Sequence, residues 1–197
     1  MNHRLTLLPL FACLAIGLSA CSKTETTAAP TAAVATSATQ TYELVAAGAR
    51  GFTVGPLMSA YTVYVLFDPQ CPHCGHLWEA ARPLLNKVKF VWVPVAIING
   101  NSTSQGAALL TAANPLETMT AHETSLLART GGLATQGSVA PEIEAALKKN
   151  TQIFNDLRLE SVPFIIAKNA ANGQFVTHSG AMDTPSLVQF LGLNAAP

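Results

Sequence analysis

The sequence predicts one α/β domain in which a β-α-β unit and a β-β-α unit are separated by a long helical insertion. Residues 61–67 form an apolar run rich in β-branched and aromatic side chains, which is typical of a strand buried on both faces. Residues 102–158 carry a helical pattern throughout. Residues 163–178 contain two strand-like runs around Asn172-Gly173, a dipeptide typical of hairpin turns.

The first unit is expected to begin with a short helix at 42–49 and a short strand at 52–54. A second helix opens at Cys71, just after the long strand. Pro83 lies inside the pattern of this helix and should kink it, because proline lacks the backbone donor and clashes with the preceding turn. Residues 88–93 are expected to form a strand parallel to the long one, through a right-handed crossover.

The insertion is expected to contain three or four helices. Pro115 and Pro141 are typical of first helical turns, and Gly131-Gly132 marks a break between helices. After the hairpin, a last helix is expected at 184–191.

The N-terminal segment has the pattern of a signal peptide. Residues 1–20 contain Arg4 and then an apolar run that is too short to span a membrane comfortably. Residues 18–21, Leu-Ser-Ala-Cys, resemble a bacterial lipobox, in which Cys21 would carry the lipid. An ordinary cleaved signal peptide is the alternative. Ser22, in place of an aspartate, favours the outer membrane by resemblance to lipoprotein sorting rules.

Residues 21–41 are rich in Thr, Ala and Ser and contain almost no large apolar side chains. Such a segment cannot bury enough surface to offset the entropy of ordering, so it is expected to be a flexible tether. The globular domain is then 42–197. Either form of export would place it in the periplasm, an oxidising compartment.

Charge and cysteine content exclude several classes of protein. Eleven Lys and Arg residues balance eleven Asp and Glu residues, and the basic residues are scattered, so no nucleic-acid partner is expected. Of four cysteines, Cys13 and Cys21 lie in the N-terminal segment, and Cys71 and Cys74 form one Cys-x-x-Cys. No cysteine remains for a structural disulfide or a four-thiolate zinc site.

The Cys-x-x-Cys at a helix start predicts redox chemistry. Free backbone N–H groups and the helix dipole favour a thiolate at Cys71, which would be the attacking sulfur. Cys74 lies one turn further in and would resolve the mixed disulfide. Pro72 and His73 are expected to tune the pKa of Cys71, and a more stable thiolate makes a stronger oxidant.

The segment Asp68–Pro83, DPQCPHCGHLWEAARP, resembles the active-site helix of DsbG and DsbC, periplasmic disulfide oxidoreductases with thioredoxin-fold catalytic domains. Residues 161–164, Ser-Val-Pro-Phe, stand where thioredoxin-fold proteins carry a cis-proline. The resemblance covers about residues 50–193 and implies a thioredoxin-like fold with a helical insertion. It also implies that Val162 and Pro163 form the loop that contacts the client protein. The Cys-Pro-His-Cys tetrad matches that of the oxidant DsbA.

The resemblance implies a thiol–disulfide oxidoreductase without a cofactor, acting on thiols and disulfides of exported proteins with a membrane or periplasmic redox partner. Oxidase, reductase and isomerase activities all stay open. DsbG and DsbC carry an N-terminal dimerisation domain where this chain has only the tether and a short segment, so a monomer is expected. Val162 replaces their threonine before the cis-proline, a difference expected to affect redox potential and client choice.

Metal-binding functions are the main alternatives to thiol–disulfide exchange. A c-type haem site needs histidine directly after the second cysteine, where this chain has Gly75. A copper or zinc metallochaperone would use Cys71, Cys74 and a histidine, and a cis Pro163 would oppose it. The candidate histidines are His76, His122 and His178.

Two further residues beside the motif have open roles. Trp78 either packs in the core or serves the redox site. Asp68 either ends the strand and caps the helix or takes part in the redox chemistry. His76 is expected at the surface.

Overall fold

The structure is a computed structural model and describes residues 36–135 and 137–193. The predicted signal peptide at 1–20 and the predicted lipid attachment at Cys21 lie outside the described residues, as does most of the tether expected at 21–41.

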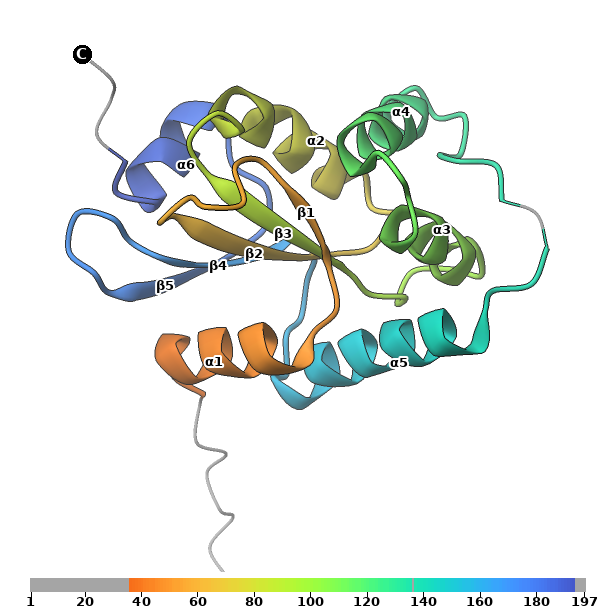
Figure 1. Cartoon of the computed structure of the whole chain (residues 1–197), viewed down its shortest axis with the longest axis horizontal. Coiled ribbons are helices and arrows are strands. Elements are labelled where there is room, and N and C mark those ends of the chain that lie inside the picture. The colour runs from red at the N-terminus through yellow and green to blue at the C-terminus, as the bar shows by residue number, and fades with distance from the viewer. Residues whose placement is uncertain (1–35, 136, 194–197) are drawn as a thin grey trace, which may run out of the picture. The chain divides into compact units, whose positions relative to one another are not determined.

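A mixed five-stranded sheet is the centre of the domain, with the strand order β1-β3-β2-β4-β5 (Figure 1). β2 and β3 are parallel and are joined through helix α2, whereas the pairs β1·β3, β2·β4 and β4·β5 are antiparallel. The predicted β-α-β unit and the predicted hairpin are therefore confirmed. The strands are β1 (Phe52–Val54), β2 (Thr62–Phe67), β3 (Lys89–Pro94), β4 (Phe164–Lys168) and β5 (Phe175–Ser179).

The helices cover both faces of the sheet. α2, α4 and α6 lie on one side, and α1 and α5 on the other (Figure 1). The predicted insertion consists of α3, α4 and α5, and proline stands in the first turn of the last two, as expected. Within the described part of the chain, no helix is long and apolar enough to cross a membrane. The helices are α1 (Ala38–Gly48), α2 (Pro72–Ala81), α3 (Asn101–Leu110), α4 (Pro115–Leu127), α5 (Pro141–Asp156) and α6 (Thr184–Phe190).

The central strand has apolar side chains on both faces, as the sequence predicts. Val65 and Phe67 belong to the cluster under α2 and α6, and Leu66 belongs to the cluster under α1 and α5, because successive side chains of a strand alternate. On the α2 side, the Trp78 and Trp92 rings pack edge to face with 5.4 Å between centroids. The redox helix is therefore held by the larger core cluster.

Helix α1 begins four residues earlier than the sequence pattern indicates, so residues 38–41 are helical and the tether boundary at 41 is wrong. The cause is a capping box: the Ser37 hydroxyl accepts from the Gln40 N–H, and the Gln40 side chain accepts from the Ser37 N–H. Thr41 and Val45 form the buried side of this helix.

Pro83 ends helix α2 instead of kinking a longer one. The chain tightens into a 3₁₀ turn, Arg82–Leu84, directly after Ala81. A 3₁₀ turn at a helix end accommodates a proline that cannot donate to the preceding turn.

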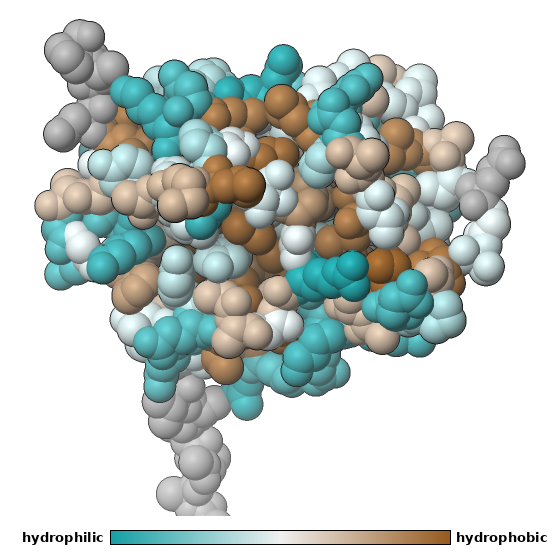
Figure 2. All heavy atoms as spheres, in the orientation of Figure 1, coloured by the Kyte–Doolittle hydropathy of each residue, from teal (hydrophilic) through white to brown (hydrophobic). Residues whose placement is uncertain are grey.

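The surface of the domain mixes polar and apolar residues, and Figure 2 shows both kinds interspersed over the face seen in Figure 1. Large apolar side chains that stay exposed include Leu57 and Met58 in the β1–β2 loop, and Ile97 and Ile98 after β3.

Candidate redox site

The two cysteines occupy the first turn of α2, as predicted. Cys71 is the N-cap residue and Pro72 the first helical residue, a position where the missing proline donor costs nothing. The Cys71 N–H donates to the Asp68 carbonyl at 2.9 Å, and the Cys74 N–H donates to the Cys71 carbonyl at 2.9 Å. Cys71 retains 5% of its surface and Cys74 none, and the two thiols are not joined in the structure. Only the first sulfur can meet a partner.

The pKa of Cys71 is lowered to about 6. The largest cause is a hydrogen bond from the Cys74 side chain; burial opposes it. The backbone N–H groups of Cys74 and His73 and the positive charge of His73 lower the pKa of Cys71 further. The direction agrees with the sequence-based expectation, but the neighbouring thiol contributes more than His73 does.

The pKa of Cys74 moves the opposite way, well above its ordinary value. Burial is the main cause, followed by the hydrogen bond to Cys71 and the charge of Cys71. At neutral pH the pair therefore consists of one accessible thiolate and one buried thiol that donates to it.

A loop from the other half of the sheet completes the site. The peptide bond between Val162 and Pro163 is cis, as predicted, and β4 begins at the next residue. Cys71 Sγ lies 3.5 Å from the Val162 carbonyl oxygen, to which it donates in its protonated form. The backbone of Val162 therefore lies directly beside the outer sulfur.

The histidines proposed as metal ligands are placed elsewhere. His76 is exposed on α2, and His178 lies on β5. His122 is buried with both nitrogens engaged: Nε2 donates to the Pro69 carbonyl at 2.7 Å, and Nδ1 accepts from the Leu133 N–H at 3.1 Å. Over residues 36–135 and 137–193, no three Cys, His, Asp or Glu side chains are grouped as metal ligands.

Asp68 is a fully buried acceptor that directly follows the end of β2, as one of the two alternatives had it, but its side chain does not cap α2. Its carboxylate accepts from the N–H groups of Ile97 at 2.7 Å and Ile98 at 3.0 Å, from the Ser102 hydroxyl at 2.7 Å, and from the Gln70 N–H at 2.8 Å. It therefore fastens the loop before Cys71 to the loop after β3.

The helical insertion also contacts the loop before Cys71, through hydrogen bonds to the side-chain amide of Gln70. The Gln70 side chain donates to Gln105 and to the Gly131 carbonyl, and accepts from Asn99 at 3.0 Å. Together with the His122 bond to Pro69, these contacts fix the segment that presents Cys71. The sequence pattern does not reveal them, since the partners are far apart in the chain.

Glu123 of α4 is the functional candidate that sequence reasoning missed. Its side chain is fully buried, and neither carboxyl oxygen has a hydrogen-bond partner among the described residues. It lies against the redox helix: a Cβ placed on Gly75 would come within 2.8 Å of Glu123 Oε2. The available signal was its place on the buried stripe of α4, with Met119, His122 and Leu126.

The pKa of Glu123 is raised to about 9, first by burial and then by the charges of Cys71 and Glu79. At neutral pH this residue is therefore a neutral carboxylic acid beside the dithiol.

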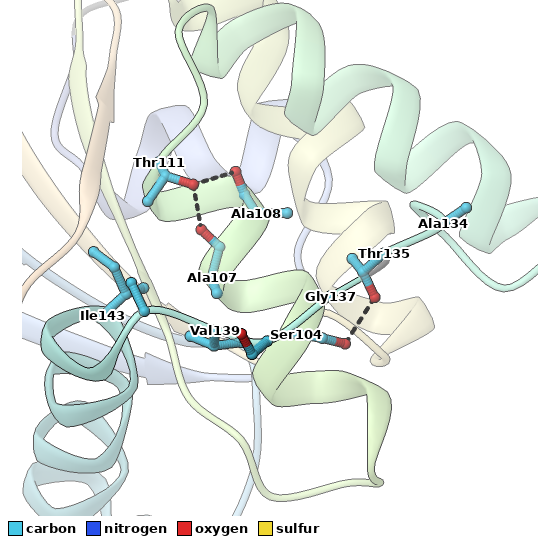
Figure 3. A pocket seen from close by; sticks show the side chains of 11 residues that line it. Ser104, Ala107, Ala108, Thr111, Ala134, Thr135, Gly137, Val139 and Ile143 are labelled. Carbon is cyan, nitrogen blue, oxygen red and sulfur yellow. Dashed lines mark hydrogen bonds between the residues drawn. The ribbon is translucent and has the colours of Figure 1, made fainter.

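A separate pocket of about 350 Å³ lies between α3, the loop before α5 and the start of α5 (Figure 3). The Thr135 hydroxyl donates to Ser104 across it at 2.9 Å, and Thr111 donates to the carbonyl of Ala107. Its described lining contains neither cysteine nor any charged side chain, so it offers no group for thiol chemistry.

Comparison with curated proteins gives sequence relatives of one kind. The chain is 30% identical over 132 residues to the thiol:disulfide interchange protein DsbG of Pseudomonas aeruginosa, covering 66% of this chain and 50% of that protein. It is 31% identical over 115 residues to DsbG of Escherichia coli, covering 56% and 44%. The chain thus spans about half the length of these relatives. No family model matches it.

Solved structures share the fold at low identity. Proteus mirabilis ScsC in a transitional conformation has a TM-score of 0.61 at 15% identity, covering 79% of each chain. The thiol-disulfide exchange protein alpha-DsbA2 of Wolbachia pipientis has a TM-score of 0.60 at 17% identity, covering 80% of this chain and 94% of that one. A periplasmic thioredoxin-like protein of Salmonella enterica has a TM-score of 0.59 at 15% identity, covering 77% and 93%. The chain contains a thioredoxin-like domain with a helical insertion, and this domain is similar in sequence to DsbG.

Proposed function

We propose that this protein is a thiol–disulfide oxidoreductase that exchanges disulfides with exported proteins through Cys71 and Cys74. The observation that carries the proposal is the asymmetry of the pair. The outer sulfur has a pKa of about 6, and the inner sulfur is a buried thiol with a raised pKa. The name of the DsbG relatives, thiol:disulfide interchange protein, supports the same chemistry.

In the reducing direction, the Cys71 thiolate attacks a client disulfide, and one client sulfur leaves as a thiolate. Cys74 then loses its proton and attacks Cys71 in the mixed disulfide. The second client sulfur leaves, and two electrons have passed from the pair to the client. The same steps in reverse oxidise a client dithiol, and a low pKa at Cys71 favours this direction because it stabilises the reduced pair.

The residues around the pair would serve binding and tuning. The Val162 backbone lies beside Cys71 and is suited to pair with an extended client segment, with Pro163 shaping the loop. Pro72 starts the helix that supplies N–H groups to the thiolate, and His73 adds positive charge.

The decisive experiment is trapping. In a Cys74→Ala variant the mixed disulfide cannot be resolved, so client proteins should accumulate as adducts that a reductant releases. Cys71→Ser, which changes the neighbouring sulfur, is the matched control and should trap nothing. If the first variant forms no adducts in cells, the proposed exchange is wrong.

The direction of exchange depends on the redox partner that resets the pair. The state of Cys71–Cys74 in cells, measured by alkylation, distinguishes the cases. A mostly oxidised pair indicates an oxidase recharged by an oxidant, and a mostly reduced pair indicates a reductase or isomerase fed with electrons.

We further propose a periplasmic location with a lipid anchor at Cys21. The lipobox-like residues 18–21 support the anchor, and the periplasmic neighbour from Salmonella supports the compartment. A Cys21→Ser variant should move from the membrane fraction to the soluble periplasmic fraction; if it stays with the membrane, the anchor is wrong.

A further inference from the structure

The loop that joins β1 to β2 presents large apolar side chains to solvent. Met58 is 95% exposed, Leu57 is 71% exposed, and Tyr61, just before β2, is 41% exposed. Within the part of the chain that the structure describes, no other large apolar side chain is as exposed as Leu57 and Met58. Exposed apolar side chains that cluster, unlike scattered ones, mark a contact surface, because a partner that covers them removes apolar area from water.

This loop lies at the end of the sheet opposite the dithiol. It leads into the amino end of β2, whereas Cys71 follows the carboxyl end of the same strand. Helix α1 begins at the loop's end of the sheet as well (Figure 1). In its second turn, the Tyr42 ring lies 4.6 Å from that of Phe175, which pairs with the last residue of β4, a strand antiparallel to β2. A contact made by this loop therefore leaves the redox site free.

Lysines surround the loop. The Ser59 hydroxyl donates to the Lys87 carbonyl, and the Lys89 N–H donates to the Tyr61 carbonyl at 2.9 Å, so both lysines stand beside it. Lys168 ends β4 at the same end of the sheet. Three of the five lysines among the described residues are thus gathered here, and none of the three forms an ion pair with a described carboxylate. The surface around the apolar loop is therefore positively charged.

An anionic bilayer fits this combination of side chains. Proteins that lie on a membrane place apolar and aromatic residues in the headgroup boundary, while nearby lysines meet anionic headgroups. Glu43 on α1 belongs to the same end but does not cancel three lysines. The chain also arrives here from Cys21, the proposed anchor, and the fifteen positions from Cys21 to Thr36 reach at most about 50 Å. The anchor would thus keep this end of the domain close to the bilayer.

We propose that the β1–β2 loop, with Leu57 and Met58 at its tip and the three lysines around it, docks the domain on an anionic phospholipid bilayer. The redox end is then turned away from the membrane, towards clients. This inference rests on the proposed anchor at Cys21 and goes beyond the proposed disulfide exchange. Two apolar side chains bind a membrane only weakly and reversibly, so docking orients a tethered domain, and a Cys21→Ser variant still leaves the membrane fraction.

The test introduces Met58→Trp into the full chain, which is reconstituted in vesicles of phosphatidylethanolamine and phosphatidylglycerol with brominated acyl chains. Because Met58 is almost fully exposed, the change removes no packing. Trp78 and Trp92 are fully buried, so the bromine does not reach them. A docked residue lies about 5–10 Å into the headgroup boundary, so the emission added by Met58→Trp should fall by about twofold.

Matched variants test the position and the charge. Ile97→Trp adds a tryptophan at an exposed apolar site beside Asp68, at the redox end, and its emission should not respond to the bromine. Added to Met58→Trp, the double change Lys87→Gln and Lys89→Gln should lower the ratio of docked to undocked domain by about tenfold. The same double change on α5, Lys148→Gln and Lys149→Gln, should leave that ratio unchanged.

Three outcomes would overturn the inference. Equal responses of Met58→Trp and Ile97→Trp in vesicle-bound protein would refute docking by this loop and leave the anchor intact. Protein that does not float with the vesicles would refute both the docking and the anchor. A blue shift of the Met58→Trp emission that depends on protein concentration, and not on lipid, would assign the loop to a second copy of the chain. The trapping variant tests disulfide exchange separately, so its result and these are distinguishable.

Discussion

The first turn of α2 and the middle of α4 shift the pKa of an ionisable group in opposite directions. At Cys71, the Cys74 side chain donates a hydrogen bond, the backbone N–H groups of the helix start add to it, and the pKa of the thiol falls to about 6. At Glu123, the surrounding helix has used its N–H groups in its own backbone, and the pKa of the carboxyl rises to about 9. Burial raises the pKa of both groups, but at Cys71 the hydrogen-bond donors outweigh it, whereas Glu123 has no donor among the described residues and burial prevails.

The largest expected effect concerns stability against pH at Glu123. Its folded pKa of about 9 exceeds the ordinary 4.5, so the folded state holds the proton more tightly. The stabilisation is complete below pH 4.5 and is lost as the pH rises towards 9, at up to about 1.4 kcal/mol per pH unit.

Unfolding in urea at pH 5 and pH 8 checks this. Over that interval, the free energy of unfolding should fall by several kcal/mol more for the unsubstituted protein than for Glu123→Gln. Titrating groups that the two proteins share contribute equally and cancel in this difference. An equal change in the free energy of unfolding for the two proteins would mean that Glu123 is charged or solvated in the folded state.

The next effect concerns the contact between the two helices. A methyl group on Gly75 would lie 2.8 Å from Glu123 Oε2 and 3.0 Å from Leu127 Cγ. Gly75→Ala should therefore lower the free energy of unfolding by about 1–3 kcal/mol through overpacking. Gly100→Ala, where nothing lies within 4 Å of the added methyl, is the matched control. Adding Glu123→Ala should relieve part of the loss; additive costs would show that the two residues do not touch.

These two regions also differ in how far the sequence predicts them. The α2 turn is local: its cysteines, proline and preceding strand are contiguous, so motif and spacing place it correctly. The residues around Asp68 and Glu123 come from loops and helices tens of residues away. Helical periodicity places Glu123 on the buried stripe of α4, but it does not show that the redox helix packs against that stripe. The early start of α1 was missed for another reason, since a two-residue capping box outweighs a tether-like composition.

A smaller effect concerns the hydrogen bond from the Cys74 side chain to Cys71. The Cys74 side chain is the largest cause of the low pKa of Cys71, so Cys74→Ala should raise that pKa by about 1 or more. Cys74→Ser keeps a hydroxyl donor and should retain part of the lowering. Iodoacetamide alkylation of Cys71 against pH measures both. If serine and alanine give the same pKa, the hydrogen bond from position 74 is not the main cause.

The smallest expected effect distinguishes hydrogen-bond donors from positive charge as causes of the low pKa of Cys71. His73 is exposed, and its charge is the last of the causes that lower the pKa of Cys71. His73→Ala should therefore raise that pKa by only about 0.3, as is typical of a solvent-screened pair. In 1 M salt the Debye length falls to about 3 Å, so this difference should vanish, whereas the difference produced by Cys74→Ala should persist because it arises from a buried hydrogen bond. A His73→Ala effect as large as that of Cys74→Ala would mean that charge, and not donors, governs the redox helix.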